Sequence, residues 1–176
     1  MLCSTPLRAN ANRELTMYFF RSDDSKGLMI GAYSGSSDSE SEWAETGESI
    51  SIADDAALAR SVPLVYIVAV TEDSTPPPPL WRKRMADRLN SIRSSAFYFA
   101  LVAPDAQMLG VFTAIRWMIK PSSAGRISAA PTFMDAAKWV RKVSGAAYPS
   151  LESLYDEVRL ASASSRRLVA SRRAPS

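Results

Sequence analysis

Residues 64–70 read LVYIVAV, a continuous apolar run that is rich in β-branched side chains. Pro63 precedes the run, and polar residues follow it from Thr71 onward. A short apolar run without alternation, bounded by turn-forming residues, is typical of a strand that is buried on both faces. Such strands belong to parallel sheets covered by helices, so this stretch predicts an α/β fold.

Strands of the same sheet are predicted on both sides of this run. Residues 17–21 (MYFFR) and 28–33 (LMIGAY) flank a turn-rich segment that ends at Gly27, and together they predict a hairpin. The apolar run at 96–103 (AFYFALVA) predicts a second buried strand. A short edge strand is predicted over residues 126–129.

Helices are predicted between and after these strands. Residues 80–92 and 106–120 carry apolar side chains at helical spacing, and Asp105 is placed to cap the second helix. The capping pattern at Thr132–Asp135 opens a helix that is predicted to end at Gly145. Alternating strands and helices predict one α/β domain. Its mixed sheet has four or five strands, an N-terminal hairpin plus parallel strands, and is covered by helices.

Three segments fall outside this alternation. Residues 34–51 (SGSSDSESEWAETGESIS) are rich in serine and glutamate, so we expect a solvated loop, followed by a short helix over 52–60. Residues 1–15 predict a polar lead-in to a domain that spans residues 16–160. After a last helix that starts near Pro149, residues 161–176 are rich in Ser, Ala and Arg and predict a disordered tail.

The composition excludes several kinds of site. The chain of 176 residues has no histidine and a single cysteine, Cys3. Histidine-based nucleophile arrangements, His-ligated metals, internal disulfides and thiolate zinc sites are therefore excluded. We expect no cofactor and no metal, and the sequence favours a protein that is not an enzyme. Carboxylate chemistry at Glu72 or Asp73 is the remaining enzymatic alternative, although no partner group for it can be identified.

Neither the net charge nor the hydropathy pattern identifies the kind of partner. The formal net charge is +3, and this mild bias does not by itself imply nucleic acid. The arginines of residues 166–173 are not interleaved with aromatic residues, so base stacking is not indicated. No apolar run has the length of a membrane span, and residues 1–15 lack the apolar core of a signal peptide. We expect a cytoplasmic protein.

The first candidate site is the loop that follows LVYIVAV. Thr71, Ser74 and Thr75 place hydroxyl groups just past the carboxyl end of a buried strand, which is the edge where open α/β sheets bind ligands. Such hydroxyls can bind an anion or accept a phosphate, which would add negative charge beside Glu72 and Asp73. The alternative interpretation is a polar connector.

The second candidate site is the basic helix over residues 80–92. Its candidate partner-binding residues are Trp81, Arg82, Lys83, Arg84 and Arg88. The alternative interpretation is a solvated charged face, and the acidic stretch over 38–48 is a candidate intramolecular partner. We also expect core packing for three tryptophans at helical positions among apolar neighbours, Trp81, Trp117 and Trp139.

Three stretches together resemble bacterial STAS-like domains of the SpoIIAA-like group. They are LVYIVAVTEDSTPPPPLWRKRMADRL, AFYFALVAPDAQMLGVFTAIRWMIK and PTFMDAAKWV, within a likeness that covers residues 17–143. The resemblance implies a four- or five-stranded sheet covered by helices, and no catalytic activity. It also implies a partner switch by phosphorylation of a hydroxyl residue after a central strand, here Ser74 or Thr75. The family's Asp-Ser-Ser/Gly-Gly run is replaced in this chain by prolines.

These observations favour a regulatory module that binds another protein through residues 71–88. The alternative is a carrier of a lipid or small anion, suggested by the bulky apolar side chains of residues 108–119 beside the basic helix.

Overall fold

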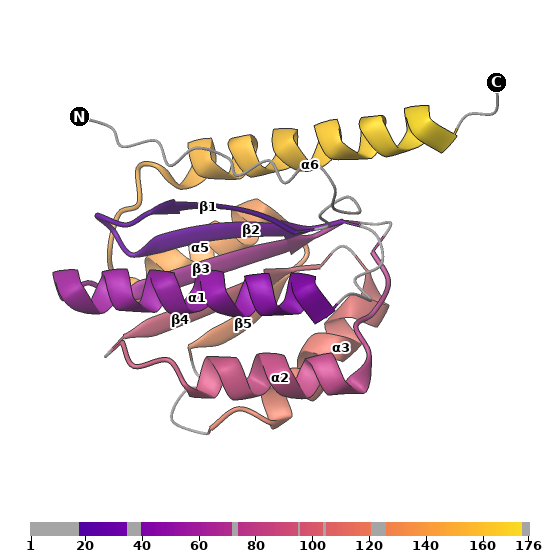
Figure 1. The fold of residues 1–176 in the computed structure, drawn as a ribbon. Coiled ribbons are helices and arrows are strands. Elements are labelled where there is room, and N and C mark those ends of the chain that lie inside the picture. Colours follow the sequence, from indigo (N-terminus) through magenta and orange to yellow (C-terminus); the bar gives the residue numbers. More distant parts are fainter. Residues whose placement is uncertain are drawn as a thin grey trace.

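A five-stranded sheet forms the middle layer of the computed structural model (Figure 1). The model describes residues 18–34, 40–71, 74–94, 96–103, 105–120 and 126–173. The strands are β1 (Tyr18–Asp23), β2 (Leu28–Tyr33), β3 (Leu64–Val70), β4 (Phe97–Val102) and β5 (Ile127–Ala130). They lie in the order β1-β2-β3-β4-β5, with β1 antiparallel to β2 and all other pairs parallel. The predicted α/β fold with a mixed sheet is therefore confirmed.

Strand β3 is buried on both faces, as its sequence predicts. Tyr66 and Val68 point into one hydrophobic core, whereas Val65 and Ile67 point into the other. Since helices cover both faces, neither set of side chains needs to be polar. This arrangement explains why the run LVYIVAV shows no alternation.

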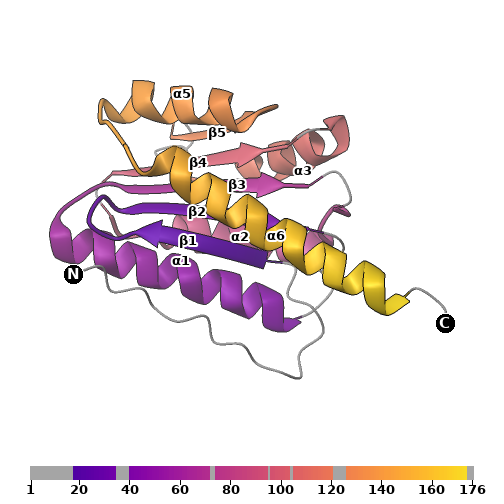
Figure 2. The same cartoon turned by 90° about the horizontal axis from the view of Figure 1, so that it is seen from above.

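Helices cover the two faces of the sheet in separate groups. Helices α1 (Glu40–Arg60), α2 (Pro79–Asn90) and α3 (Ala106–Trp117) connect the parallel strands and share one core with the sheet. Helices α5 (Phe133–Ser144) and α6 (Leu151–Arg173) cover the other face, where α6 runs across β1 and β2 (Figure 2). The strand order follows the chain order, so the described strands contain no reversal of the kind that opens a ligand crevice in doubly wound sheets.

Helix α1 corrects the expectation for residues 34–51. A solvated loop before a short helix at 52–60 is wrong from Glu40 onward, because α1 begins there and continues to Arg60. Thr46 and Ser49 occupy buried positions on this helix, and the apolar pattern starts only at Ile50. Because polar residues occupy buried positions, the apolar residues of this segment do not recur at helical spacing. Residues 35–39 lie outside the described part of the chain.

Helix α6 also extends further than the sequence predicts. The expectation of a disordered tail from Ala161 is wrong as far as Arg173, where the helix ends. Leu151, Leu154 and Val158 form a buried stripe, and Ser162 continues it with only 2% of its surface exposed. A small polar residue thus extends the buried face of the helix, and a serine does not by itself predict burial. Residues 174–176 lie outside the described ranges.

The predicted helix ends are largely confirmed. The Asp105 side chain caps α3 by accepting a hydrogen bond from the Met108 N–H at 2.8 Å, and Thr132 caps α5 by accepting from the Asp135 N–H at 3.2 Å. Gly145 ends α5 in the left-handed conformation, with φ of 66°. Helix α3 ends at Trp117, before the predicted end at Lys120.

The tryptophans differ in burial. Trp81 is buried and Trp139 is half-buried, in line with packing in the core. The expectation is wrong for Trp117, which is 83% exposed. Trp117 follows the buried Ile115 by two positions, which places it on the opposite side of the helix.

A buried carboxylate ties α1 to the loop between α2 and β4. Asp54 is 4% exposed and accepts hydrogen bonds from the backbone N–H groups of Arg93 and Ser94, each at 3.0 Å, and from the Ser94 hydroxyl at 2.5 Å. Desolvation by burial raises the pKa of Asp54, but these hydrogen bonds together with the Arg93 charge outweigh it and leave the pKa below its usual value.

Replacing Gly27 with alanine is expected to destabilise the fold far more than the same change at Gly145. Both glycines have positive φ, at 62° and 66°. A Cβ at Gly27 would lie 2.1 Å from the carbonyl oxygen of Pro63, whereas nothing lies within 4 Å at Gly145. We expect Gly145→Ala to lower the free energy of unfolding by about 1–2 kcal/mol, and Gly27→Ala by about 3 kcal/mol or more. Urea unfolding measures both, and equal losses would contradict the close approach.

Asp54→Asn is expected to lower the free energy of unfolding at neutral pH by about 2–3 kcal/mol, because several donors then lose a charged acceptor. Because the pKa of Asp54 is lower in the folded state than in the unfolded state, its charge stabilises the fold at pH values above the unfolded-state pKa. This stabilisation is lost as the pH falls through the folded-state pKa. The difference between wild type and variant should therefore be full at pH well above 3.8, the ordinary pKa, and shrink below it. A difference that stayed constant into acid would show that the Asp54 charge is irrelevant.

Candidate functional site

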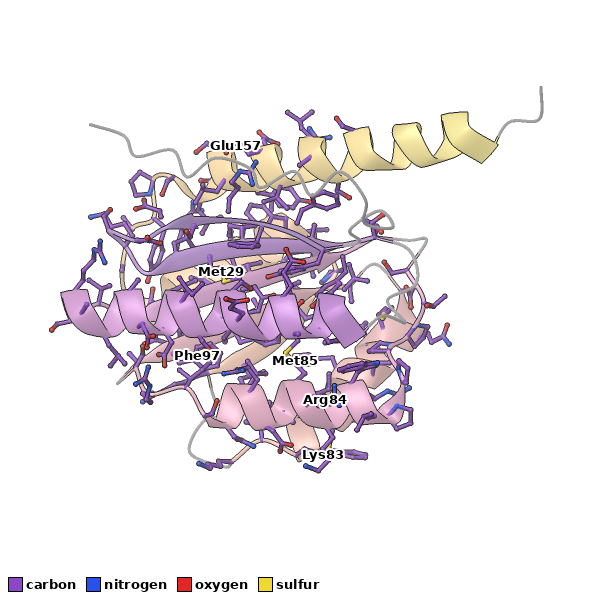
Figure 3. The ribbon with its side chains drawn as sticks, viewed as in Figure 1. Met29, Lys83, Arg84, Met85, Phe97 and Glu157 are labelled. Carbon is purple, nitrogen blue, oxygen red and sulfur yellow. The ribbon has the colours of Figure 1, made fainter. Side chains whose placement is uncertain are left out.

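A groove of about 400 Å³ lies between α1 and α2. Its lining includes Trp43 and Ile50 from α1, and Trp81, Arg84, Met85 and Arg88 from α2. In Figure 3, Met85 lies on the side of α2 that faces α1, whereas Lys83 lies on the side turned away. The groove thus combines aromatic rings, an apolar floor and two guanidinium groups.

Hydroxyl contacts with the sheet set the position of α1. The phenol oxygen of Tyr33 lies 2.6 Å from Thr46 Oγ1, and that of Tyr18 lies 3.4 Å from Ser49 Oγ and 3.1 Å from the phenol oxygen of Tyr66. Burial raises the pKa of Tyr18 to about 12 and that of Tyr66 well above its usual value. Both phenols therefore stay protonated at neutral pH and can donate within this network.

Stacked aromatic rings connect the sheet to α2 through Trp43 of α1. The Tyr33 and Trp43 ring centres lie 5.7 Å apart, and those of Trp43 and Trp81 lie 5.0 Å apart, with the two indole planes inclined by 9°. The guanidinium carbon of Arg84 lies 4.2 Å from the centre of the Trp81 ring, a cation–π contact. One side of the groove is therefore a stack of defined geometry.

Arg88, which lines the groove, also links α2 to α1. Its guanidinium donates a hydrogen bond to Ser51 Oγ at 2.6 Å. A Cβ at Gly47 would lie 3.3 Å from Arg88 Nη2, so glycine at this position leaves room for the arginine against the helix. Asp87 also borders the groove, and its carboxylate pairs with Lys83 at 2.6 Å.

The predicted partner-binding residues divide into two groups. Trp81, Arg84 and Arg88 come together in the groove. Arg82 does not line it; its Nε donates to the carbonyl oxygen of Pro77 at 2.9 Å. Lys83 forms its exposed ion pair with Asp87, on the outer side of α2.

The predicted hydroxyl loop lies next to the end of β2. The Thr71 N–H and hydroxyl donate to the carbonyl oxygen of Tyr33 at 3.0 and 3.1 Å, and the Ser74 hydroxyl donates to the same oxygen at 3.3 Å. Thr75 is exposed. Thr71 and Ser74 thus hold the backbone of Tyr33, whose ring stacks on Trp43. The other two candidates in this loop, Glu72 and Asp73, lie outside the described residues.

Residues of α1 are the part of the site that sequence reasoning missed. Trp43, Gly47 and Ile50 line the groove, but they lie in the segment that was expected to be mostly loop. The available signal was Trp43, the one large apolar side chain in a Ser- and Glu-rich stretch. Within the acidic stretch over 38–48, Trp43 stacks on Trp81 of the basic helix, and Ser51, which follows the stretch, accepts a hydrogen bond from Arg88.

The apolar side chains of α3 do not line this groove. Met108, Val111, Phe112 and Ile115 are buried in the core that α3 shares with the sheet. They fill the interior, so the apolar content that suggested a lipid carrier is already used in packing.

The chemistry of the groove is that of binding. Guanidinium groups recognise carboxylates and phosphates through charge-assisted hydrogen bonds, and indole faces accept flat or apolar groups. Within the described ranges, no three His, Cys, Asp or Glu side chains are grouped so that they could hold a metal ion.

Comparisons of the chain with protein-family models, with curated proteins and with solved structures gave no significant match. Among the helices described, none has the length and apolar character needed to cross a membrane.

Trp43→Ala is expected to lower the free energy of unfolding by about 2–4 kcal/mol, because it removes the stacking contacts to Tyr33 and Trp81. It should also increase the quenching of Trp81 fluorescence by iodide. Trp117→Ala is the matched control, and its effect should stay within about 0.5 kcal/mol because that side chain is exposed. If the two variants were equally stable, the Trp43–Trp81 stack would not be a structural contact.

Proposed function

We propose that this chain is a non-enzymatic regulatory module that binds another protein through the groove between α1 and α2. The observation that carries the proposal is the gathering of the stacked Trp43–Trp81 pair with Arg84 and Arg88 in one groove.

Trp and Arg are enriched among the residues that contribute most to protein–protein affinity. Here the sheet and the neighbouring helix already hold their side chains. Trp43 is fixed between Tyr33 and Trp81, and Arg84 lies over the Trp81 ring. Binding would therefore cost less side-chain entropy than it would with mobile side chains.

The charge of the groove indicates the chemistry of the partner. Arg84 and Arg88 line it together with Asp87, whose carboxylate pairs with Lys83. A complementary partner segment carries a carboxylate for the guanidinium groups and an adjacent apolar or aromatic side chain for the space beside Met85 and Ile50. The partner we propose is thus an acidic, partly apolar segment of another protein.

The resemblance to STAS-like domains agrees with this proposal, since the resemblance implies a module that binds proteins without catalysis. In that view the loop with Ser74 and Thr75 would regulate the groove through Tyr33. We also propose that the protein acts in the cytoplasm.

A small anionic ligand is the second candidate function. The volume of about 400 Å³ lies within the range of small-molecule sites. Native mass spectrometry of the protein purified from its own cells separates the two candidates. A bound anion that is released by Arg84→Gln would favour the ligand, and an unliganded protein would favour the protein partner.

A photo-crosslinking amino acid at Ala44, an exposed residue that lines the groove, is expected to capture the partner in living cells. The same amino acid at the exposed Lys138 of α5, on the other face of the sheet, is the position control. Arg84→Gln should reduce the yield at Ala44 by about tenfold, since it removes a central cation. Lys142→Gln, which removes an exposed cation of α5 on the other face of the sheet, should leave the yield unchanged.

Two outcomes would contradict the proposal. One is equal capture from Ala44 and Lys138. The other is equal loss in the Arg84 and Lys142 variants, which would indicate a diffuse charge effect and no defined site.

A further inference from the structure

The end of α3 presents an apolar pair to solvent. Trp117 is 83% exposed, more than any other large apolar side chain that the structure describes, and Met118 beside it is 41% exposed. Neither lines the groove between α1 and α2. An exposed tryptophan with an apolar neighbour is the type of feature that marks an interaction surface.

The exposure of this pair is built into the fold. Ile115 and Ile119, on either side of it in sequence, are buried with 9% and 6% of their surface exposed. Asn90 of α2 fastens the turn, because its Nδ2 donates to the Met118 carbonyl oxygen at 3.0 Å and its Oδ1 accepts from the Lys120 N–H at 2.9 Å. With both isoleucines in the core and the backbone held, Trp117 cannot turn inward without breaking these contacts.

Positive charge surrounds the pair. Arg116 precedes the pair and Lys120 follows it after Ile119; both are exposed, and Lys120 Nζ also donates to the Asn90 carbonyl oxygen at 3.3 Å. Between Asp105 and Asp135 the chain has no carboxylate. Asp105 caps the opposite end of α3. The pair is therefore an apolar tip in a cationic setting.

We propose that the Trp117–Met118 tip docks on an anionic lipid surface. Tryptophan favours the interface between lipid headgroups and hydrocarbon, and methionine can follow it into the acyl region. Arg116 and Lys120 then meet the anionic headgroups, each contributing to affinity as basic residues do at such surfaces. A membrane suits this arrangement because its uniform negative charge complements the flanking cations and it requires no shaped pocket on either side.

The inference is independent of the groove. It uses α3 and the turn after it, so a protein bound between α1 and α2 and a membrane bound at Trp117 involve different residues. With one aromatic anchor and two cations, the expected binding is weak and reversible, and it declines with added salt.

Co-sedimentation of the full chain with vesicles tests the proposal. The probes are vesicles of phosphatidylcholine alone, and vesicles of phosphatidylcholine and phosphatidylserine in equal parts. We expect binding to the mixed vesicles only. Trp117→Ala should weaken it by about tenfold. Arg116→Gln and Lys120→Gln should each weaken it by about fivefold. Thermal unfolding of each variant checks that it is folded.

Two controls keep the result specific. Met134→Ala removes a side chain of α5 that is 49% exposed on the other face of the sheet, and should leave binding unchanged. Arg166→Gln with Arg167→Gln removes charge from α6 and should have little effect. The proposal is overturned if the mixed vesicles do not bind, if Trp117→Ala binds as wild type does, or if only the α6 variant loses binding.

Discussion

The contact between the hydroxyl side of α1 and the tyrosines of the sheet is the constraint on which the rest of the structure depends. Tyr18, Tyr33 and Tyr66 present phenols from three strands, and Thr46 and Ser49 meet this layer from the helix. Tyr18, Tyr66, Thr46 and Ser49 are buried and Tyr33 is partly buried. Each hydrogen bond therefore satisfies a polar atom that is costly to remove from water. The network favours one rotation and one position of α1, because a shifted helix would leave buried hydroxyls without partners.

The position of α1 creates the groove. With the helix fixed, Trp43 lies between Tyr33 and Trp81, and Ser51 accepts a hydrogen bond from Arg88 of α2. The strands follow chain order and α1, α2 and α3 share one face, so the described sheet has no reversal where a crevice would open at its edge. The candidate site consequently lies between two helices, and the hydroxyl loop at the edge donates hydrogen bonds to the carbonyl oxygen of Tyr33, whose ring stacks on Trp43.

The sequence predicts what depends on local physics. The buried run of β3, the caps at Asp105 and Thr132, and the stop at Gly145 follow from side-chain type and spacing, and all are found. It also groups five residues of one basic helix, of which Trp81, Arg84 and Arg88 line the groove whereas Arg82 and Lys83 do not. It misses the α1 side of the groove and the length of α6, since Thr46, Ser49 and Ser162 occupy buried positions where the pattern requires apolar residues. Their burial depends on partners distant in sequence or on the small volume of serine. Neither cause produces apolar residues at helical spacing in the sequence.

From Glu40 onward, the Ser- and Glu-rich segment is a helix that packs on the sheet and lines one side of the groove. Native-state hydrogen exchange of the backbone amides of residues 46–57 tests it most directly. We expect slow exchange, with protection close to that of β3, because these amides lie in a helix that buried side chains hold on the sheet. Exchange as fast as that of an unstructured peptide would show that α1 is not docked, and the groove, its stacked tryptophans and the proposed partner site would fall with it.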